Sequence, residues 1–322
     1  MIKDFGIIIA CCDQDFMFAK ACCASIKDNL GDIEICLIID GNFSTIDLEK
    51  AYNVHIINRK NISSSVLRKR SFGFGLTKMI AFWESPWKNF LYVDADTNIF
   101  GNILEFADFV NFDIIIDRPH YHRTDSDINT YFFNTSGIEK YFPDFDWQEH
   151  RGDYFCTGVF FGKRDIFSLE EYIGFLDLMD RNPQLFLMGE QGLVNFMICR
   201  AADRGEIRLS QQSIQLLVPD FDQEVLAQRF PLEHKNLDPQ ERGTVIHWCG
   251  PKKPVSGISD VYKEPMTFYR RKSIRDIYGH SGFTAEVILK IEDFQYHLYL
   301  YKNKFRRKIN KVKILLKKSI SG

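Results

Sequence analysis

The sequence lacks the long apolar runs of a membrane-spanning chain and the motifs of a disulfide or thiol-redox protein. No apolar stretch reaches the roughly 20 residues of a transmembrane helix. The run GIIIACC at residues 6–12 starts too early for a secretory signal and has no cleavage site. None of the eight cysteines forms a C-x-x-C motif, and most lie in apolar segments, where a free thiol acts as a small hydrophobic side chain. We therefore expect a cytoplasmic protein with reduced thiols, the alternative being a disulfide or a metal role for the cysteines.

The net charge is also small, but it is unevenly distributed. The 322 residues carry a formal net charge of −2, yet nine of the 41 Lys and Arg and none of the 43 Asp and Glu lie from residue 302 onward. An acidic body with a basic tail indicates a partner for the tail and does not bear on the fold. Because the rest of the chain is not basic, we expect no nucleic-acid partner.

The tail has the pattern of a basic amphipathic helix. Within residues 302–318, Phe305, Ile309, Val312 and Leu316 recur at helical spacing, and Lys and Arg occupy the other faces. Helices of this kind lie on anionic membrane surfaces. We therefore expect the tail to hold the protein on the inner face of a membrane, the alternatives being a solvated tail and a helix docked on the acidic body.

The hydrophobic pattern predicts an α/β fold. In the first hundred residues, strands are expected at 6–12, 34–40, 54–58 and 89–94, with helices near 16–29, from Ser44 or Thr45 toward Tyr52, and near 75–84. This alternation is typical of a mostly parallel sheet covered on both faces. Later strands are expected at 112–117, 153–162 and 243–250, with helices from Ser168 to about Met179 and from near Glu190 to Arg204. Residues 118–150 have no clear period and are expected to form a long functional loop or insertion.

One of these strands ends in two acids. In FLYVDADTNIFGNI, residues 90–103, Asp94 and Asp96 follow four residues typical of a buried strand. Ligands of open α/β sheets bind beyond the carboxyl ends of the strands, and side chains two residues apart in an extended chain point to the same side. Two converging carboxylates suit Mg²⁺ or Mn²⁺, and such an ion would neutralise a diphosphate leaving group. The pair alone is weak evidence, because acids at a strand end also form turns and helix caps.

Two further segments contain the other residue types that such a site needs. In VIHWCGPKKP, His247 could supply an imidazole ligand at a strand end. Gly250 would let the backbone approach a phosphate, and Lys253 would offer it a positive charge. In MGEQGLVNF, residues 188–196, a carboxylate and an amide begin a helix between two glycines. Each segment has an ordinary alternative, namely a buried core histidine and an acid that complements a helix dipole.

Taken in order along the chain, these segments resemble the retaining glycosyltransferases of family 8, the glycogenin and lipopolysaccharide galactosyltransferase group. The resemblance begins with RSFGFGLTKMIAFW and FLYVDADTNIFGNI. It continues with YFCTGVFF, GEQGLVN and HWCGPKKP, which resemble the family's F-N-[SA]-G, G-D-Q-x-x-L-N and H-x-x-G-x-x-K-P. It covers most of residues 5–255. It implies a GT-A fold, which is a Rossmann-like nucleotide-diphospho-sugar transferase fold. We place this domain at residues 1–258 and expect a helical extension at 259–301 and the basic amphipathic tail at 302–322 after it.

The resemblance also implies a role for each candidate site residue at its matching position. The implied residues are Asp94, Asp96 and His247 for Mn²⁺ or Mg²⁺; Asp13, Lys78, Asp117, Gly250 and Lys253 for the nucleotide-sugar donor; and Glu190 and Gln191 for the reacting sugar carbon. Within the donor set, Asp13 would lie by the nucleotide base and Asp117 by the donor sugar. The family transfers sugar with retention, and the acceptor hydroxyl is thought to lose its proton to the leaving phosphate.

The sequence departs from the family pattern at several positions. Cys156 replaces the Asn of F-N-x-G, Glu190 replaces an Asp, and Val255 replaces a common Trp. Residues 118–150 have no counterpart that aligns. These differences concern the identity of the donor sugar more than the type of reaction.

The resemblance thus implies a hexosyltransferase. It would move a sugar with retention from a nucleotide sugar, most simply a UDP-sugar, to a glycan or a lipid-linked acceptor such as a growing bacterial surface glycan. One alternative is a catalytically silent GT-A-like protein that serves as a membrane-associated binding or scaffold module. Another is a nucleotidyltransferase, which would need a glycine-rich basic loop after the first strand that CCDQDF does not provide.

Overall fold

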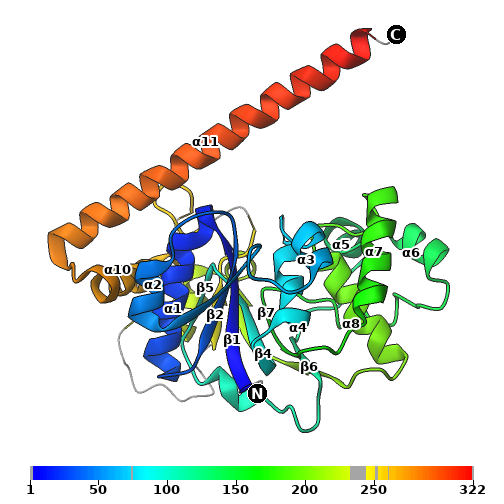
Figure 1. The fold of residues 1–322 in the computed structure, drawn as a ribbon, viewed down its shortest axis with the longest axis horizontal. Helices are drawn as coiled ribbons and strands as arrows, with labels where there is room; N and C mark the ends of the chain where they lie inside the picture. The colour runs from blue at the N-terminus through cyan, green and yellow to red at the C-terminus, as the bar shows by residue number, and fades with distance from the viewer. Residues whose placement is uncertain (1–2, 74, 233–243, 251–252, 260, 321–322) are drawn as a thin grey trace.

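A mostly parallel sheet forms the centre of the molecule (Figure 1). The computed structural model describes residues 3–73, 75–232, 244–250, 253–259 and 261–320, with side chains through residue 305. The strands are β1 (Lys3–Cys12), β2 (Ile35–Asp40), β3 (Val54–Asn58), β4 (Trp87–Asp94), β5 (Thr97–Ile99), β6 (Ile114–Asp117), β7 (Val159–Lys163), β8 (Leu209–Gln212), β9 (Gln215–Leu217) and β10 (Val245–His247). Seven of them form a sheet in the order β3-β2-β1-β4-β7-β6-β8, in which β7 runs antiparallel to both of its neighbours. A second sheet of three strands has the order β5-β10-β9.

Helices cover both faces of the large sheet. The helices of the described residues are α1 (Phe16–Leu30), α2 (Ile46–Tyr52), α3 (Ser65–Arg70), α4 (Ala81–Glu84), α5 (Asp125–Tyr131), α6 (Thr135–Tyr141), α7 (Leu169–Arg181), α8 (Gln191–Asp203), α9 (Gln223–Arg229), α10 (Glu264–Tyr278) and α11 (Gly282–Ile320). Four short 3₁₀ helices are η1 (Asp13–Asp15), η2 (Leu76–Ile80), η3 (Ile103–Phe106) and η4 (Val218–Asp220). In Figure 1, α1, α2 and α10 lie on one side of the sheet and α3, α4, α7 and α8 on the other.

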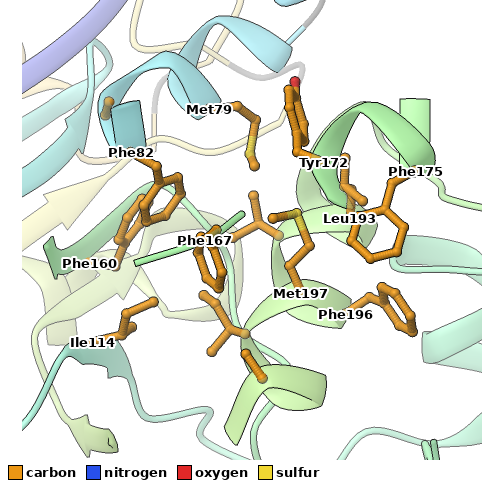
Figure 2. Packing of buried hydrophobic residues seen from close by; sticks show 14 of the residues in the cluster. Met79, Phe82, Ile114, Phe160, Phe167, Tyr172, Phe175, Leu193, Phe196 and Met197 are labelled. Atoms are coloured by element: carbon orange, nitrogen blue, oxygen red, sulfur yellow. The ribbon is translucent and has the colours of Figure 1, made fainter. Parts of the chain in front are cut away.

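The central strands divide the hydrophobic core into two clusters. In β1, Ile7 and Ile9 belong to one cluster and Ile8 to the other, because successive side chains of a strand point to opposite faces. All three are fully buried, as expected of a parallel strand covered on both faces. Figure 2 shows the cluster on the α4, α7 and α8 side, where the rings of Phe82 and Phe160 stack with their centroids 5.7 Å apart. The predicted α/β architecture is therefore present, and its parallel strands end at one edge of the sheet.

The segment at 118–150 differs from the expected loop, because it contains α5 and α6. Thr124 caps α5 with a capping box, and the side chain of Asn134 caps α6 through the backbone N–H of Gly137. Phe132 and Phe133, between the two helices, are buried in the core. The prediction was wrong here because helices of seven residues are too short to show a clear hydrophobic period.

Two predicted strands are shorter than expected. The strand predicted at 153–162 begins only at Val159, and residues 153–158 form turns and irregular backbone that lead into it. The strand predicted at 243–250 is reduced to Val245–His247, and residue 243 lies outside the described residues. The backbone that adjoins each strand reaches the edge of the sheet where the acid pair lies.

The C-terminal helices form an extension that packs on α1. Helix α11 begins beside α10 and projects away from the body of the molecule toward the C-terminus (Figure 1). Buried ion pairs hold its first half, since Glu292 contacts Lys20 at 2.6 Å and Arg270 at 2.9 Å. The expected boundary at residue 302 falls inside α11. Within the described parts of the chain, no helix is sufficiently long and apolar to cross a membrane.

Candidate active site

The acid pair lies where β4 ends, with Asp94 as its last residue and Asp96 in the turn between β4 and β5. The hydroxyl of Thr97 donates to the carbonyl of Asp94 at 2.8 Å, and the backbone N–H of Trp248 donates to the carbonyl of Asp96 at 3.1 Å. The backbone N–H of Asp94 donates to the carbonyl of Gly158 at 2.7 Å. The turn is therefore tied to the segments before β7 and after β10, and both acids are held at the edge where the strands end.

Strand pairing brings His247 to the same place. Strand β5 pairs antiparallel with β10, with Thr97 opposite His247. One ligand atom from each of Asp94, Asp96 and His247 lies within 4.8 Å of the others. The Nε2 atom of His247 is 3.8 Å from Oδ2 of Asp94 and 3.6 Å from Oδ1 of Asp96. The three predicted ligands therefore converge.

A buried lysine, Lys78, and a partly buried one, Lys253, flank the acid pair. Lys78 lies 3.2 Å from Oδ1 of Asp94, and Lys253 forms an ion pair with Asp96. Burial would lower the pKa of each lysine, but Asp94 beside Lys78 and Asp96 beside Lys253 raise it above its usual value, so both remain cations. Burial disfavours ionisation of Asp96, yet Lys253 and His247 outweigh it and hold the pKa of that carboxyl well below its usual range. The site therefore combines two carboxylates with two fixed positive charges.

Glu190 faces the same site from the start of α8. Its Oε1 atom lies 2.7 Å from the ammonium of Lys78 and accepts a hydrogen bond of 3.2 Å from the hydroxyl of Thr157. Gly75 allows this approach, because a Cβ atom there would lie 1.7 Å from Oε2 of Glu190. Lys78 thus bridges Glu190 and Asp94.

These groups line a cavity of about 490 Å³. Its walls include Ala10, Cys11, Cys12, Asp15, Asp40, Gly75, Thr77, Lys78, Tyr92, Asp94, Ala95, Asp96, Met188, Glu190, Gly250, Lys253 and Tyr299. Six of the predicted residues line it, and His247, which is only 1% exposed, lies buried beside Asp96. Five carboxylates, including the acid pair, and two lysines therefore line the cavity, and this excess of acid suits a divalent metal that binds a diphosphate.

Asp13 lies in an adjoining cavity of about 440 Å³. This second cavity lies between the start of α1 and α11, and its walls include Asp13, Phe16, Tyr296 and Tyr299. Tyr299 lines both cavities. The two spaces are therefore neighbours, and Asp13 is placed beside the acid pair's cavity, not within it.

The side chains of two predicted site residues, Gln191 and Asp117, form hydrogen bonds with backbone groups outside the cavity. The amide of Gln191 donates to the carbonyl of Tyr131 at 2.9 Å, and Gln191 is not among the residues that line either cavity. Asp117 is buried, and its Oδ1 atom accepts from the backbone N–H groups of Ile214 at 3.0 Å and Gln215 at 3.1 Å. Burial raises the pKa of Asp117 to about 7, although these two hydrogen bonds act in the opposite direction.

Sequence reasoning missed several residues of the site. The hydroxyl of Tyr92 donates to Oδ1 of Asp94 at 2.7 Å. Because Tyr92 lies two residues before Asp94 on a strand, the two side chains point to the same face, and this spacing could have indicated the contact. Asp15 and Tyr299 line the cavity from η1 and α11. Gln215 contacts His247, and nothing in the local sequence indicates that contact.

A second cluster of metal-ligand types, His150, Asp153 and Cys199, has a structural explanation. The ring nitrogens of His150 lie 2.8 Å from a carboxylate oxygen of Asp153 and 3.0 Å from one of Asp203. Burial would lower the pKa of His150, but the hydrogen bond to Asp153, with further contributions from Cys199 and Asp203, raises it to about 11. An imidazolium with both nitrogens bonded to carboxylates has no lone pair for a metal, so we interpret this cluster as an ion pair.

The residues at the acid pair fit a divalent metal by their chemistry. Two carboxylates and one imidazole offer oxygen and nitrogen ligands from one side, which suits Mn²⁺ and leaves other positions for phosphate oxygens. The imidazole favours Mn²⁺ over Mg²⁺, which binds mostly oxygen.

Solved structures with a similar fold are glycosyltransferases, whereas no family model and no curated protein matches the chain. The bifunctional glycosyltransferase WbbM matches with a TM-score of 0.52 and 12% identity over 87% of this chain and 52% of its own. The glycosyltransferase GlyE of Streptococcus pneumoniae TIGR4 matches with a TM-score of 0.55 and 13% identity over 84% of this chain and 60% of its own. The galactosyltransferase LgtC, solved with donor and acceptor sugar analogues, matches with a TM-score of 0.52 and 12% identity over 83% of this chain and 95% of its own.

These likenesses confirm the GT-A fold that the sequence resemblance implied, and the structure itself shows the C-terminal helices α10 and α11 that follow the sheet. The chain spans about half the length of WbbM and 60% of GlyE. At 12 to 13% identity, the comparison concerns the fold alone.

Proposed function

We propose that the protein is a retaining, metal-dependent glycosyltransferase that uses a nucleotide sugar, most simply a UDP-sugar. The acceptor would be a hydroxyl of a glycan or of a lipid-linked molecule. The observation that supports this most strongly is the convergence of Asp94, Asp96 and His247 at the end of β4, beside a cavity lined by two lysines. The GT-A fold makes this the edge of the sheet where a nucleotide sugar is expected.

The diphosphate of the donor would lie between the acid pair and the lysines. Asp94, Asp96 and His247 would hold Mn²⁺ or Mg²⁺, which when bound neutralises diphosphate charge as a Lewis acid. Lys253 lies on the Asp96 side and would contact the phosphates with the backbone of Gly250, whose positive φ of 79° suits glycine. These fixed positive charges would stabilise the charge that develops on the leaving diphosphate.

The nucleotide base would occupy the adjoining cavity. Asp13 offers a carboxylate there, and Phe16 and Tyr299 offer aromatic rings on which a base can stack. Because Tyr299 lines both cavities, a nucleotide diphosphate could span them. This assignment keeps the predicted role of Asp13 and adds the two aromatic residues.

The sugar would lie near Glu190, the predicted catalytic residue that lines the cavity. In the transfer, the bond from the sugar carbon to the phosphate oxygen breaks, the bond to the acceptor oxygen forms, and the acceptor proton moves to the leaving phosphate. Glu190 and Lys78 would position the sugar and its phosphate through their 2.7 Å ion pair. We propose that Gln191 supports the start of α8 through Tyr131, and that Asp117 acts through the backbone it holds.

The proposal is tested by UDP release from a panel of UDP-sugars with Mn²⁺. Native protein is expected to turn over at least one donor, and Asp96→Asn is expected to abolish release while it remains folded, because one metal ligand is lost. Asp32→Asn, at an exposed acid, is the matched control and is expected to retain native activity. NMR of the product should show the anomeric configuration of the donor. An Asp96→Asn protein with native activity would refute the metal assignment, and UDP binding without turnover of any donor would favour the silent binding module.

We also propose that α11 lies on an anionic membrane surface. Large apolar side chains are exposed along it, including Phe283, Phe294, Tyr301 and Phe305, and the basic residues predicted for the tail follow in the same helix. The side chains beyond residue 305 lie outside the described residues. Native protein should co-sediment with vesicles that contain phosphatidylglycerol and much less with phosphatidylcholine alone. Truncation after Tyr301 should release it, and unchanged co-sedimentation would refute the proposal.

A further inference from the structure

Gln215 lies behind the imidazole of His247, on the side away from the acid pair. Its Oε1 atom is 3.0 Å from Nδ1 of His247, and its side chain is only 1% exposed. The opposite ring nitrogen, Nε2, is the one that faces Asp94 and Asp96. The imidazole therefore lies between an amide oxygen and two carboxylates.

This contact determines which ring nitrogen carries a hydrogen. An amide oxygen only accepts hydrogen bonds, so the Nδ1 atom of His247 must be the donor. The lone pair of the neutral ring then belongs to Nε2, the atom that points to the acid pair. The sulfur of Cys156 is also near Nδ1, at 3.8 Å, but a thiol sulfur is a weak acceptor at a longer distance. Gln215 is thus the main partner of Nδ1.

The orientation of the Gln215 amide is itself fixed. Its Nε2 atom donates to the carbonyl of Cys156 at 2.8 Å, which leaves Oε1 for His247. The backbone N–H of Gln215 donates to the buried carboxylate of Asp117 at 3.1 Å. An amide flipped by half a turn would place its NH₂ group against Nδ1 and its oxygen against the Cys156 carbonyl, and two oxygens in contact repel. The network therefore permits one orientation of the amide.

We propose that Gln215 is a positioning residue of the metal site, which holds the Nδ1–H of His247 so that Nε2 is presented to the ion. This inference rests on the proposed metal role of His247. Metal-binding histidines commonly donate their other N–H to an outer partner, and loss of that partner weakens metal affinity by about 10- to 100-fold. Asp117 contributes to the same arrangement without contact to His247, because its carboxylate holds the backbone of Gln215. That role differs from the donor-sugar contact implied by the family resemblance.

The test is a titration of the full chain with Mn²⁺ alone, in which electron paramagnetic resonance measures the free ion. The Asp96→Asn variant, which lacks one of the proposed ligands, measures the Mn²⁺ that binds elsewhere on the protein. Gln215→Met removes the acceptor with little change in size and is expected to weaken Mn²⁺ binding at the site about 10- to 100-fold. Gln215→Glu keeps an acceptor at the same reach but places its second oxygen against the Cys156 carbonyl, so it is expected to weaken Mn²⁺ binding less than Gln215→Met does.

Each outcome bears on the proposal. Native affinity in Gln215→Met would overturn it, and so would equal weakening in Gln215→Met and Gln215→Glu, because the acceptor would then be unimportant. Native protein that binds Mn²⁺ no better than Asp96→Asn would overturn the metal site itself and this inference with it. If Gln215→Met does not fold, ¹⁵N-histidine NMR of native protein with Mg²⁺, assigned with His247→Gln, decides the question. A proton on Nδ1 supports the proposal, and a proton on Nε2 with Nδ1 bound to the metal contradicts it.

Discussion

Gly158 has no side chain, and the imidazole of His247 occupies the space that one would need. A Cβ atom on Gly158 would lie 2.1 Å from Cε1 and 2.6 Å from Nδ1 of His247. Both distances are far below van der Waals contact, and His247 is buried, so its ring would have to move. A single methyl group at this position should therefore displace the imidazole of His247 from its place in the metal site.

We expect Gly158→Ala to weaken Mn²⁺ binding at least about tenfold, because a displaced imidazole no longer faces the acid pair. Isothermal titration of Mn²⁺ into the folded variant measures this. Gly174→Ala is the control, since an added Cβ at that position in α7 meets no atom within 4 Å. It should leave Mn²⁺ affinity unchanged and stabilise the fold by about 0.5 to 1 kcal/mol. Native Mn²⁺ affinity in Gly158→Ala would show that His247 is not a ligand.

His150 should make the free energy of unfolding depend on pH. Its pKa is raised from an ordinary value of 6.5 to about 11 in the folded protein, so between these values the folded state keeps a proton that the unfolded state loses. Its contribution to stability is complete below pH 6.5 and declines as pH rises toward 11.

We expect His150→Gln to lower the free energy of unfolding by about 2 kcal/mol at pH 6, because charge-assisted hydrogen bonds to Asp153 and Asp203 are lost. The difference between native protein and variant should shrink as pH rises. Urea unfolding at pH 6, 8 and 9.5 measures it. His55→Gln, at an exposed histidine, should cost less than about 0.5 kcal/mol. A difference that stays constant with pH would show that His150 is neutral in the fold.

At the scale of whole elements, α11 is attached to the body by buried charge. Arg270 of α10 is only 3% exposed at its side chain and contacts Glu292 at 2.9 Å and Asp293 at 2.7 Å. Lys20 of α1 contacts the same Glu292. Removal of one partner from such a network leaves the others buried without their counter-charge.

Arg270→Ala should therefore destabilise the protein by about 3 kcal/mol and loosen α11. Arg271→Ala is the matched control, because Arg271 pairs with Glu286 at a site where its side chain is 49% exposed, and exposed pairs contribute about 0 to 1 kcal/mol. Chemical unfolding gives the stabilities, and hydrogen exchange of the α11 amides reports the attachment. Equal effects of the two substitutions would mean that burial of the network is unimportant.

The sequence predicted those elements whose signal is local. The β1, β2 and β4 strands each contain a continuous apolar run, and the acids at the end of β4 follow such a run where ligands bind. His247 was predicted from its motif and from its place at the end of a strand expected at 243–250, of which the structure keeps the three residues of β10. Asp94, Asp96 and His247 could be predicted to form one metal site because each lies at or just beyond the end of a strand.

What the sequence did not predict depends on contacts between distant segments. Gln215 lies on a three-residue strand, and its role follows from the parallel pairing of β9 with β10. Gln191 was predicted to face the sugar, but a carbonyl of α5 takes its amide, and α5 was itself not predicted. Side-chain direction at a helix start is decided by such partners and not by spacing along the chain.

At the scale of the whole molecule, the C-terminal extension and the GT-A domain share one site. Tyr299 of α11 lines the cavity that contains the acid pair of β4, although the sequence suggested a boundary at residue 258. The same helix exposes apolar side chains and continues into the basic segment. An enzyme whose donor site adjoins a membrane-binding helix would suit an acceptor carried on a lipid, and this connects the two proposals.

The most direct test of the proposed donor site is calorimetric titration of UDP into the native protein, first with Mn²⁺ and then with EDTA. We expect binding with Mn²⁺, little or none with EDTA, and none in Asp96→Asn under either condition. This result would show that UDP binding depends on both the metal and Asp96, as expected if the nucleotide and the metal bind together at the acid pair. Absence of UDP binding in native protein with Mn²⁺, or equal binding in EDTA and in Asp96→Asn, would contradict the proposed metal-dependent UDP-sugar site.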